Sequence, residues 1–203
     1  MADARFEIGL VGEYLAEAIL PDYLGCTLVA RTDKYRDQHG RCNYDYDVVF
    51  EGAHRFGGDI IYGLDAKVKS YVSYHPSIDG VKILYIDQFK YHDYIDIVND
   101  EGRDNIKFYF LFVDRSTYDI YLISDLPDYT NLYISSSEFN THGKNPENLH
   151  IAWDLSKHKP IVRFNKDARY AINRSVEKYT NEKITKEYLK KYIKNVYKKC
   201  IAL

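Results

Sequence analysis

The amino-acid sequence predicts an α/β protein with a central mixed β-sheet flanked by helices, and three observations predict it. A helix-like repeat at the N-terminus precedes several β-rich runs. A second helix-like stretch separates those runs from two further strand-like segments. Residues 107–114 are apolar nearly throughout, which is typical of a central strand buried on both faces. The 203 residues, 23.8 kDa in mass, fit one domain with a sizeable core.

Three segments have the three- and four-residue apolar spacing of helices. The first is 6–20, which Pro21 is expected to end. The second is 86–102, which ends in Gly102. The third is 184–200, where Ile184, Tyr188, Tyr192 and Val196 form one stripe among lysines.

The predicted strands are rich in β-branched and aromatic residues and are separated by turn residues. The runs 44–50 and 59–71 flank a loop with glycines at 52, 57 and 58, which predicts a hairpin. The other predicted strands are 25–31, 107–114 and 118–126.

Beyond residue 126 the sequence predicts loops, with short strands at 131–135 and 160–164. We therefore expect residues 1–126 to form the core. Residues 127–203 are expected to form a loop-rich extension, with a basic C-terminal helix packed on the same domain.

Composition excludes several classes of protein. No apolar stretch approaches the roughly 20 residues needed to span a bilayer, so no membrane partner is expected. The three cysteines form no CxxC pair, and the N-terminus lacks a basic region before its apolar run. We therefore expect a cytoplasmic, intracellular protein. Phosphate-loop, GxGxxG, HExxH and GxSxG motifs are all missing, which argues against an NTPase, a dehydrogenase, a zinc hydrolase or a serine hydrolase.

Charge is distributed unevenly along the chain. Residues 1–156 carry 14 Lys and Arg against 26 Asp and Glu, a net charge of −12. Residues 157–203 carry 14 against 4, a net charge of +10. The basic part is either a solvated layer docked on its own acidic body or a binding surface for a polyanion such as nucleic acid.

The triplet Asp65-Ala66-Lys67 carries the strongest chemical signal, because it lies in the middle of a predicted strand. Strand alternation places residues 63, 65, 67 and 69 on one face and Leu64, Ala66 and Val68 on the core face. An ion pair at a sheet edge is the structural alternative.

The neighbouring strand favours a metal site. A symmetric turn centred on Phe56 places Asp47 directly opposite Asp65 and Asp45 opposite Lys67. Two facing carboxylates are destabilising unless a cation lies between them, and Mg²⁺ prefers carboxylate and water ligands.

This order of helix, strands and motifs resembles the core of the PD-(D/E)XK nuclease superfamily, whose fold is restriction-endonuclease-like. The resemblance covers roughly residues 6–125 and rests on Glu13 in the first helix, the run YDYDVVF, the run YGLDAKVKS and the FYFLFVD strand. Tyr46 stands where the motif's proline would be, and the second acid is Asp rather than Glu. Gln88, at the start of the second predicted helix, matches a polar residue of some subgroups.

The resemblance implies a Mg²⁺-dependent endonuclease, with Mn²⁺ as a substitute metal. Asp47, Asp65 and the carbonyl of Ala66 would hold the metal, Lys67 would contact the attacking water or the phosphate, and Glu13 would lie near the metal. DNA is the expected substrate, with RNA as the alternative, and a homodimer would cut both strands. Restriction-like or phage and mobile-element DNA processing is the implied context.

The stretch 157–174 mixes basic and aromatic residues, as nucleic-acid clefts do. The residues expected to contact nucleic acid are Lys69, Arg163, Lys166, Arg169 and Arg174. Two alternatives stay open. One is a non-catalytic nucleic-acid-binding or assembly protein with the same fold, and the other is an interaction protein whose basic tail packs on its own acidic body.

Overall fold

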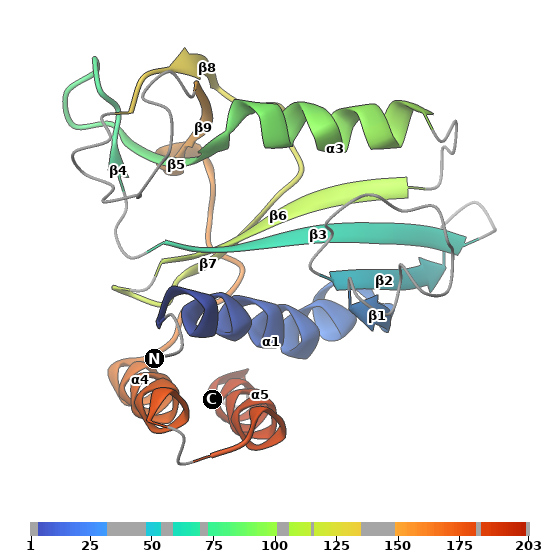
Figure 1. Ribbon diagram of the computed structural model, residues 1–203, viewed down its shortest axis with the longest axis vertical. Helices are drawn as coiled ribbons and strands as arrows, with labels where there is room; N and C mark the ends of the chain where they lie inside the picture. Colours follow the sequence, from blue (N-terminus) through green and yellow to red (C-terminus); the bar gives the residue numbers. More distant parts are fainter. Residues whose placement is uncertain are drawn as a thin grey trace.

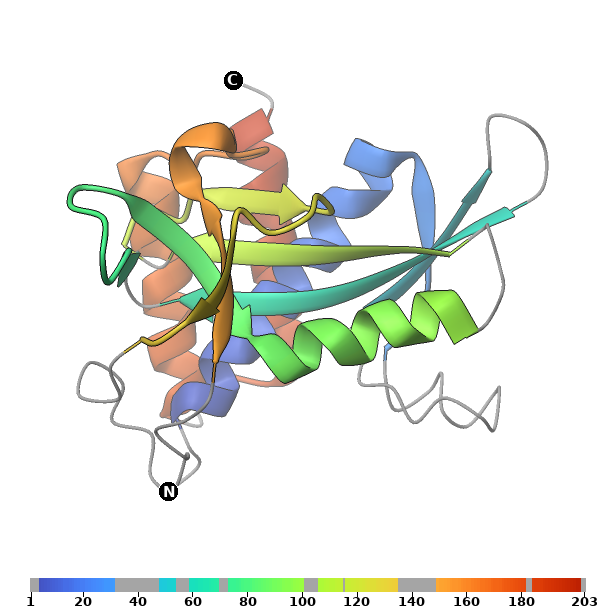
Figure 2. The same ribbon diagram turned by 90° about the horizontal axis from the view of Figure 1, so that it is seen from above.

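Four layers of secondary structure are stacked in the computed structural model (Figure 1). One face of a five-stranded sheet is covered by helix α3 (Gln88–Asp100) and a smaller sheet, and the other by helix α1 (Ala4–Leu24). Helices α4 (Lys166–Thr180) and α5 (Lys186–Ile201) pack on the far side of α1 (Figure 1, Figure 2). The structure describes residues 4–31, 48–53, 59–69, 73–100, 106–114, 116–134, 149–181 and 184–201. For some of these, among them Asp65, Lys67 and Lys69, only the backbone is described.

The five-stranded sheet is mixed, with the strand order β1-β2-β3-β6-β7. Its first three strands form an antiparallel meander, β6 runs parallel to β3, and β7 runs antiparallel to β6. The α/β class with a mixed sheet is therefore confirmed. The strands are β1 (Cys26–Arg31), β2 (Val48–Ala53), β3 (Asp59–Lys69), β6 (Ile106–Asp114) and β7 (Ile120–Ile123).

The register between β2 and β3 is the predicted one. Described pairs run from Val48 with Leu64 to Ala53 with Asp59, and the two residue numbers sum to 112 in every pair. This is the register that a symmetric turn centred on position 56 predicts. Asp47 and Asp45 lie outside the described residues.

Helix α1 is longer and more deeply buried than predicted. It continues through Pro21 to Leu24 instead of ending at residue 20. Proline removes one backbone donor but does not prevent a final turn, and Gly25 then ends the helix with a φ of 64°. The Cys26 thiol donates a hydrogen bond to the Leu20 carbonyl, 3.3 Å away. The helix is not amphipathic, because it is packed between the sheet on one side and α4 and α5 on the other.

The two faces of the five-stranded sheet contact different clusters. On the α1 side, Phe50, Tyr62, Leu64 and Leu111 join the main core. On the α3 side, aromatic residues of β6 pack against α3 and the smaller sheet; these are Phe108, Phe110 and Phe112.

The smaller sheet, with strand order β4-β5-β9-β8, was not predicted as a unit. Its strands are β4 (Ser73–Tyr74), β5 (Lys82–Asp87), β8 (Tyr129–Leu132) and β9 (His150–Asp154), and a 3-10 turn (Leu155–Lys157) follows β9. The helix predicted over 86–102 therefore begins two residues later than predicted, at Gln88, since residues 86 and 87 end β5. The run Ile83 to Ile86 is buried on both faces. Its sequence therefore lacks the alternation of apolar and polar residues that would predict a strand.

Helix α5 confirms the predicted C-terminal helix, whereas α4 was missed. Asn165 caps α4 by accepting a hydrogen bond from the Ala168 backbone N–H at 2.8 Å. Instead of the predicted strand 160–164, the structure has a single antiparallel bridge between Ile120 and Val162. In the part of the chain that the structure describes, no helix has the length and apolar character needed to cross a bilayer.

A buried ion pair joins α1 to α5. Glu17 is 7% exposed and pairs with Lys190, whose side chain reaches from α5 and is partly exposed. A carboxylate taken out of water is stabilised only if a cation and hydrogen bonds compensate its lost solvation.

We expect Lys190→Ala to lower the free energy of unfolding by about 2 kcal/mol, because it removes a cation from a buried carboxylate. Urea denaturation followed by circular dichroism measures the loss. Lys191→Ala is the matched control, since Lys191 follows Lys190 on α5 and its side chain is exposed to solvent. Equal stability of the two variants would contradict this role for Lys190.

Candidate functional site

Positions 65 and 67 lie in the C-terminal half of β3, and alternation assigns them to the face of the sheet opposite α1. Their neighbours Leu64 and Ala66 are buried in the main core, as strand alternation predicts. Positions 65 and 67 therefore fall on the face that is covered by α3 and the smaller sheet.

Parallel pairing sets what lies beside these two positions. Asp65 pairs in register with Phe110, and Lys67 pairs with Phe112. Both phenylalanines are buried in the aromatic cluster between the sheets. The register therefore places positions 65 and 67 next to the strand that supplies this cluster.

The aromatic cluster forms a rigid wall along this face. The Phe110 ring lies 5.3 Å from the Trp153 ring, and the Phe112 ring lies 5.8 Å from it, measured between centroids. The Tyr94 and Phe108 rings stack at 4.1 Å. The Trp153 indole donates a hydrogen bond to the Asp125 carbonyl at 2.9 Å, so its orientation is fixed.

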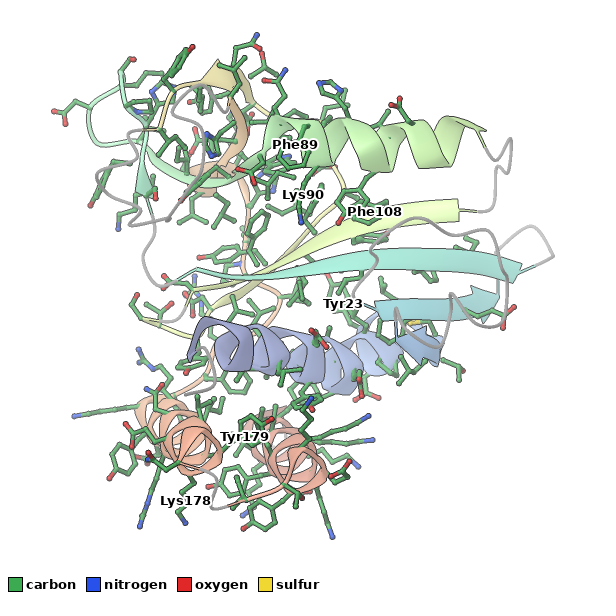
Figure 3. The ribbon with its side chains drawn as sticks, viewed as in Figure 1. Tyr23, Phe89, Lys90, Phe108, Lys178 and Tyr179 are labelled. Atoms are coloured by element: carbon green, nitrogen blue, oxygen red, sulfur yellow. The ribbon has the colours of Figure 1, made fainter. Side chains whose placement is uncertain are left out.

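Lys90 is a candidate that the sequence analysis missed. Figure 3 shows this residue between α3 and the five-stranded sheet, which is the side that carries Asp65 and Lys67. Lys90 lies one helical turn before the buried Tyr94, and this four-residue spacing was the available signal. No sequence motif surrounds Lys90, so the sequence alone does not distinguish it from a solvent-exposed helix lysine.

Gln88 begins α3 at the junction with β5 and β9. Its backbone N–H donates to the Leu149 carbonyl at 2.9 Å, and its side-chain amide lies 3.4 Å from Nε2 of His92. The Asp87 carboxylate, one residue earlier, lies 3.1 Å from Nε2 of His150 on the paired strand. These contacts fix the start of α3 and therefore the position of Lys90 two residues later.

The end of β6 carries a second group of acids. The Asp114 carboxylate is buried and accepts hydrogen bonds from the Ser116 backbone N–H at 2.8 Å and its hydroxyl at 2.7 Å. This geometry is a turn cap. Burial raises the pKa of Asp119, Arg163 at 4.0 Å opposes the shift, and Asp114 adds to it.

The raised pKa of Asp119 predicts a pH-dependent effect of Asp119→Asn. The folded protein holds the proton more tightly than the unfolded chain, so ionising Asp119 costs stability as pH rises through the raised pKa. We expect Asp119→Asn to raise the thermal midpoint at pH 7, with the gain shrinking as pH falls below that pKa. Asp79→Asn, at an exposed carboxylate, is the control. A gain that grows on acidification would contradict the assignment.

The structure does not bring Glu13 to the same face as Asp65. Glu13 lies on α1, which packs against the side of the sheet that carries Tyr62 and Leu64. The five-stranded sheet therefore separates Glu13 from the face of Asp65 and Lys67.

The predicted nucleic-acid contacts also divide between separate places. Lys69 continues the strand of Asp65 and pairs in register with Asp114. Arg163 follows the bridge between Val162 and Ile120 of β7, and its Nε lies 4.0 Å from the Asp119 carboxylate. The other three lie on α4, in the layer beyond α1; they are Lys166, Arg169 and Arg174. Helix α4 and the Asp65 face are thus on opposite sides of the sheet.

The donors described on the Asp65 face do not form a complete metal site. Among the described side chains, no three His, Cys, Asp or Glu residues are grouped so that they could hold a metal ion. The structure places the backbone of residue 65 in β3, whereas Asp47 lies outside the described residues. Extending the register of β2 and β3 by one pair would add the carboxylates of Asp47 and Asp65, and carboxylate oxygens are ligands that suit Mg²⁺.

The chain matches no protein-family model, no curated protein and no solved structure.

Proposed function

We propose that this protein is a Mg²⁺-dependent endonuclease that hydrolyses phosphodiester bonds in DNA. The observation that carries the proposal is the register of β2 and β3. The next pair in the same series would be Asp47 with Asp65. Lys67 follows Asp65 by two residues on β3. Facing carboxylates with an adjacent lysine suit a cation bound beside a phosphate.

The order of the elements supports the resemblance to the PD-(D/E)XK superfamily. Helix α1, the meander β1-β2-β3, helix α3 and strand β6 follow one another as the resemblance expects. Two strands of the smaller sheet, β4 and β5, are added between β3 and α3, and its other two, β8 and β9, follow β7. The acidic residue and the lysine both lie on the strand that pairs with β6. A restriction-endonuclease-like fold is therefore part of the proposal.

The proposal gives each residue of the face a role. Asp47, Asp65 and the carbonyl of Ala66 hold the cation. When bound, Mg²⁺ supplies an activated water and neutralises charge that develops on the scissile phosphate. Lys67 positions the attacking water or the phosphate, while Lys69 and Lys90 attract the flanking phosphates. Glu13 is not part of this set, because α1 lies on the other face of the sheet.

The wider setting is proposed from the same resemblance. DNA is favoured over RNA, Mn²⁺ is a substitute metal, and a homodimer that cuts both strands belongs to the proposal. The context would be restriction-like or phage and mobile-element DNA processing in the cytoplasm.

Incubation with supercoiled plasmid in Mg²⁺, Mn²⁺ or EDTA tests the proposed activity. We expect nicked and linear DNA with either metal and none with EDTA. Single-stranded RNA in parallel reactions tests the choice of DNA. If no metal supports cleavage of any of these substrates, the nuclease proposal is wrong.

The second candidate function is a nucleic-acid-binding or assembly protein without catalysis. The observation that favours it is the basic α4–α5 layer, which is far from the face of Asp65. Binding of DNA without cleavage in any metal would support this candidate.

A further inference from the structure

Helix α5 presents a face of exposed lysines to solvent. Its opposite side is buried in the main core through Leu189, Ile193 and Tyr197. Figure 3 shows long side chains with nitrogen tips pointing outward from this helix. We define the lysine face as Lys191, Lys194, Lys198 and Lys199, all exposed.

The lysines of the lysine face differ from Lys190 in their described ion pairs. Lys190, on the inner side, pairs with the buried Glu17. Among the described residues, by contrast, no carboxylate forms a salt bridge with any of the four lysines of the lysine face. The segment 157–203, to which α5 belongs, has a net charge of +10, so acids within this segment do not balance its lysines.

The lysine face is remote from the face of Asp65. The five-stranded sheet and α1 both lie between them (Figure 1). Packed layers are about 10 Å apart, so the two surfaces are separated by roughly 20 Å and point in opposite directions. One bound stretch of nucleic acid cannot lie flat against both.

The geometry of the lysine face fits a polyanion with regularly spaced charge. Lys191 to Lys198 spans about 10 Å along the helix, and duplex DNA carries about six phosphates over that length. Tyr188 is exposed beside the lysines and stacks on Tyr192, with ring centroids 6.3 Å apart. Exposed aromatic rings next to lysines are typical of nucleic-acid-binding surfaces.

We propose that the lysine face of α5 is a second nucleic-acid-docking surface, which binds the phosphate backbone independently of the face of Asp65. The protein would therefore hold one segment of nucleic acid on α5 while another lies at β3. Binding at α5 does not depend on the proposed cleavage, whereas the second segment at β3 rests on the proposed function.

Fluorescence anisotropy with a labelled 20-base-pair duplex in EDTA measures this binding without cleavage. The test variant is Lys191→Glu, Lys194→Glu and Lys198→Glu combined. The matched control combines Lys82→Glu, Lys107→Glu, Ser77→Glu and Thr130→Glu, which changes the net charge by the same amount at exposed residues outside α4, α5 and the stretch 157–174. Circular dichroism and thermal melting establish that each variant is folded.

We expect the test variant to bind at least tenfold more weakly than the wild type and the control to change less than threefold. The slope of log affinity against log salt should become shallower by about 3 in the test variant, because three phosphate contacts are lost.

Two outcomes would overturn the proposal. Equal losses in the test and control variants would mean that only net charge matters. Sedimentation could instead show a wild-type dimer that salt or the test variant dissociates, with no duplex binding at any salt concentration. The lysine face would then bind the acidic body of a second copy.

Discussion

Asp65→Ala is expected to abolish metal-dependent cleavage of plasmid DNA while leaving the protein folded. The substitution removes a carboxylate that the proposal assigns to the bound cation. A metal ion stabilises transition-state charge by several kcal/mol, so its loss should reduce the rate at least about a thousandfold. Nicking rates measured at equal protein concentration, with the thermal midpoint of both proteins, check this expectation.

Glu51→Ala is the matched control for Asp65→Ala. Glu51 is an exposed carboxylate on β2 and pairs with Ile61, so it occupies the same face of the sheet as Asp65. Four residues of β3, or roughly 13 Å, separate that pair from position 65. Cleavage by Glu51→Ala should match the wild type. Full cleavage by Asp65→Ala would remove this residue from the site.

Phe112→Ala is expected to lower the free energy of unfolding by about 3–5 kcal/mol. Phe112 is fully buried between β6 and the smaller sheet, where it contacts Trp153. Its loss leaves a cavity in the wall beside Lys67, with which it pairs in register. Urea unfolding measures the change, and fluorescence of Trp153, the single tryptophan, reports it locally.

The comparison for Phe112→Ala is Phe89→Ala. Phe89 lies on α3 and is 53% exposed, so its removal should change stability by less than about 0.5 kcal/mol. Similar losses for both variants would mean that the cluster around Trp153 does not join the two sheets.

Local patterns in the sequence were sufficient to predict the sheet around β3. Alternation identified Leu64 and Ala66 as core residues, because β3 is buried through every second residue. The glycine-bearing loop predicted the register of β2 and β3, because side-chain alternation and a symmetric turn act together. The apolar run 107–114 predicted β6, which is an interior strand paired with β3 and β7.

Other elements depend on contacts that local patterns do not reveal. Strand β9 pairs with β5 across more than sixty residues of sequence, and Ile151 and Trp153 are buried there against the aromatic residues of β6. Helix α1 passes Pro21 because its packing on both sides outweighs one lost hydrogen bond. Helix α4 has a narrow apolar stripe of Ala168, Ile172 and Val176, hidden among charged residues.

The candidate site was predictable only in part, for the same reason. The positions of Asp65 and Lys67 follow from one strand. The place of Lys90 depends on how α3 crosses the sheet, and the separation of Glu13 from Asp65 depends on which face α1 covers. The spacing of residues within one segment predicts neither how α3 nor how α1 packs on the sheet.

The most direct test is to locate Mn²⁺ by NMR, because paramagnetic broadening of amide signals needs no knowledge of the substrate. On titration with Mn²⁺, the account predicts selective broadening of the amides of Leu64 to Lys67, which disappears in Asp65→Ala. Amides of α5 should keep their intensity. Broadening centred on other residues, or none at millimolar Mn²⁺, would contradict a cation site on this strand.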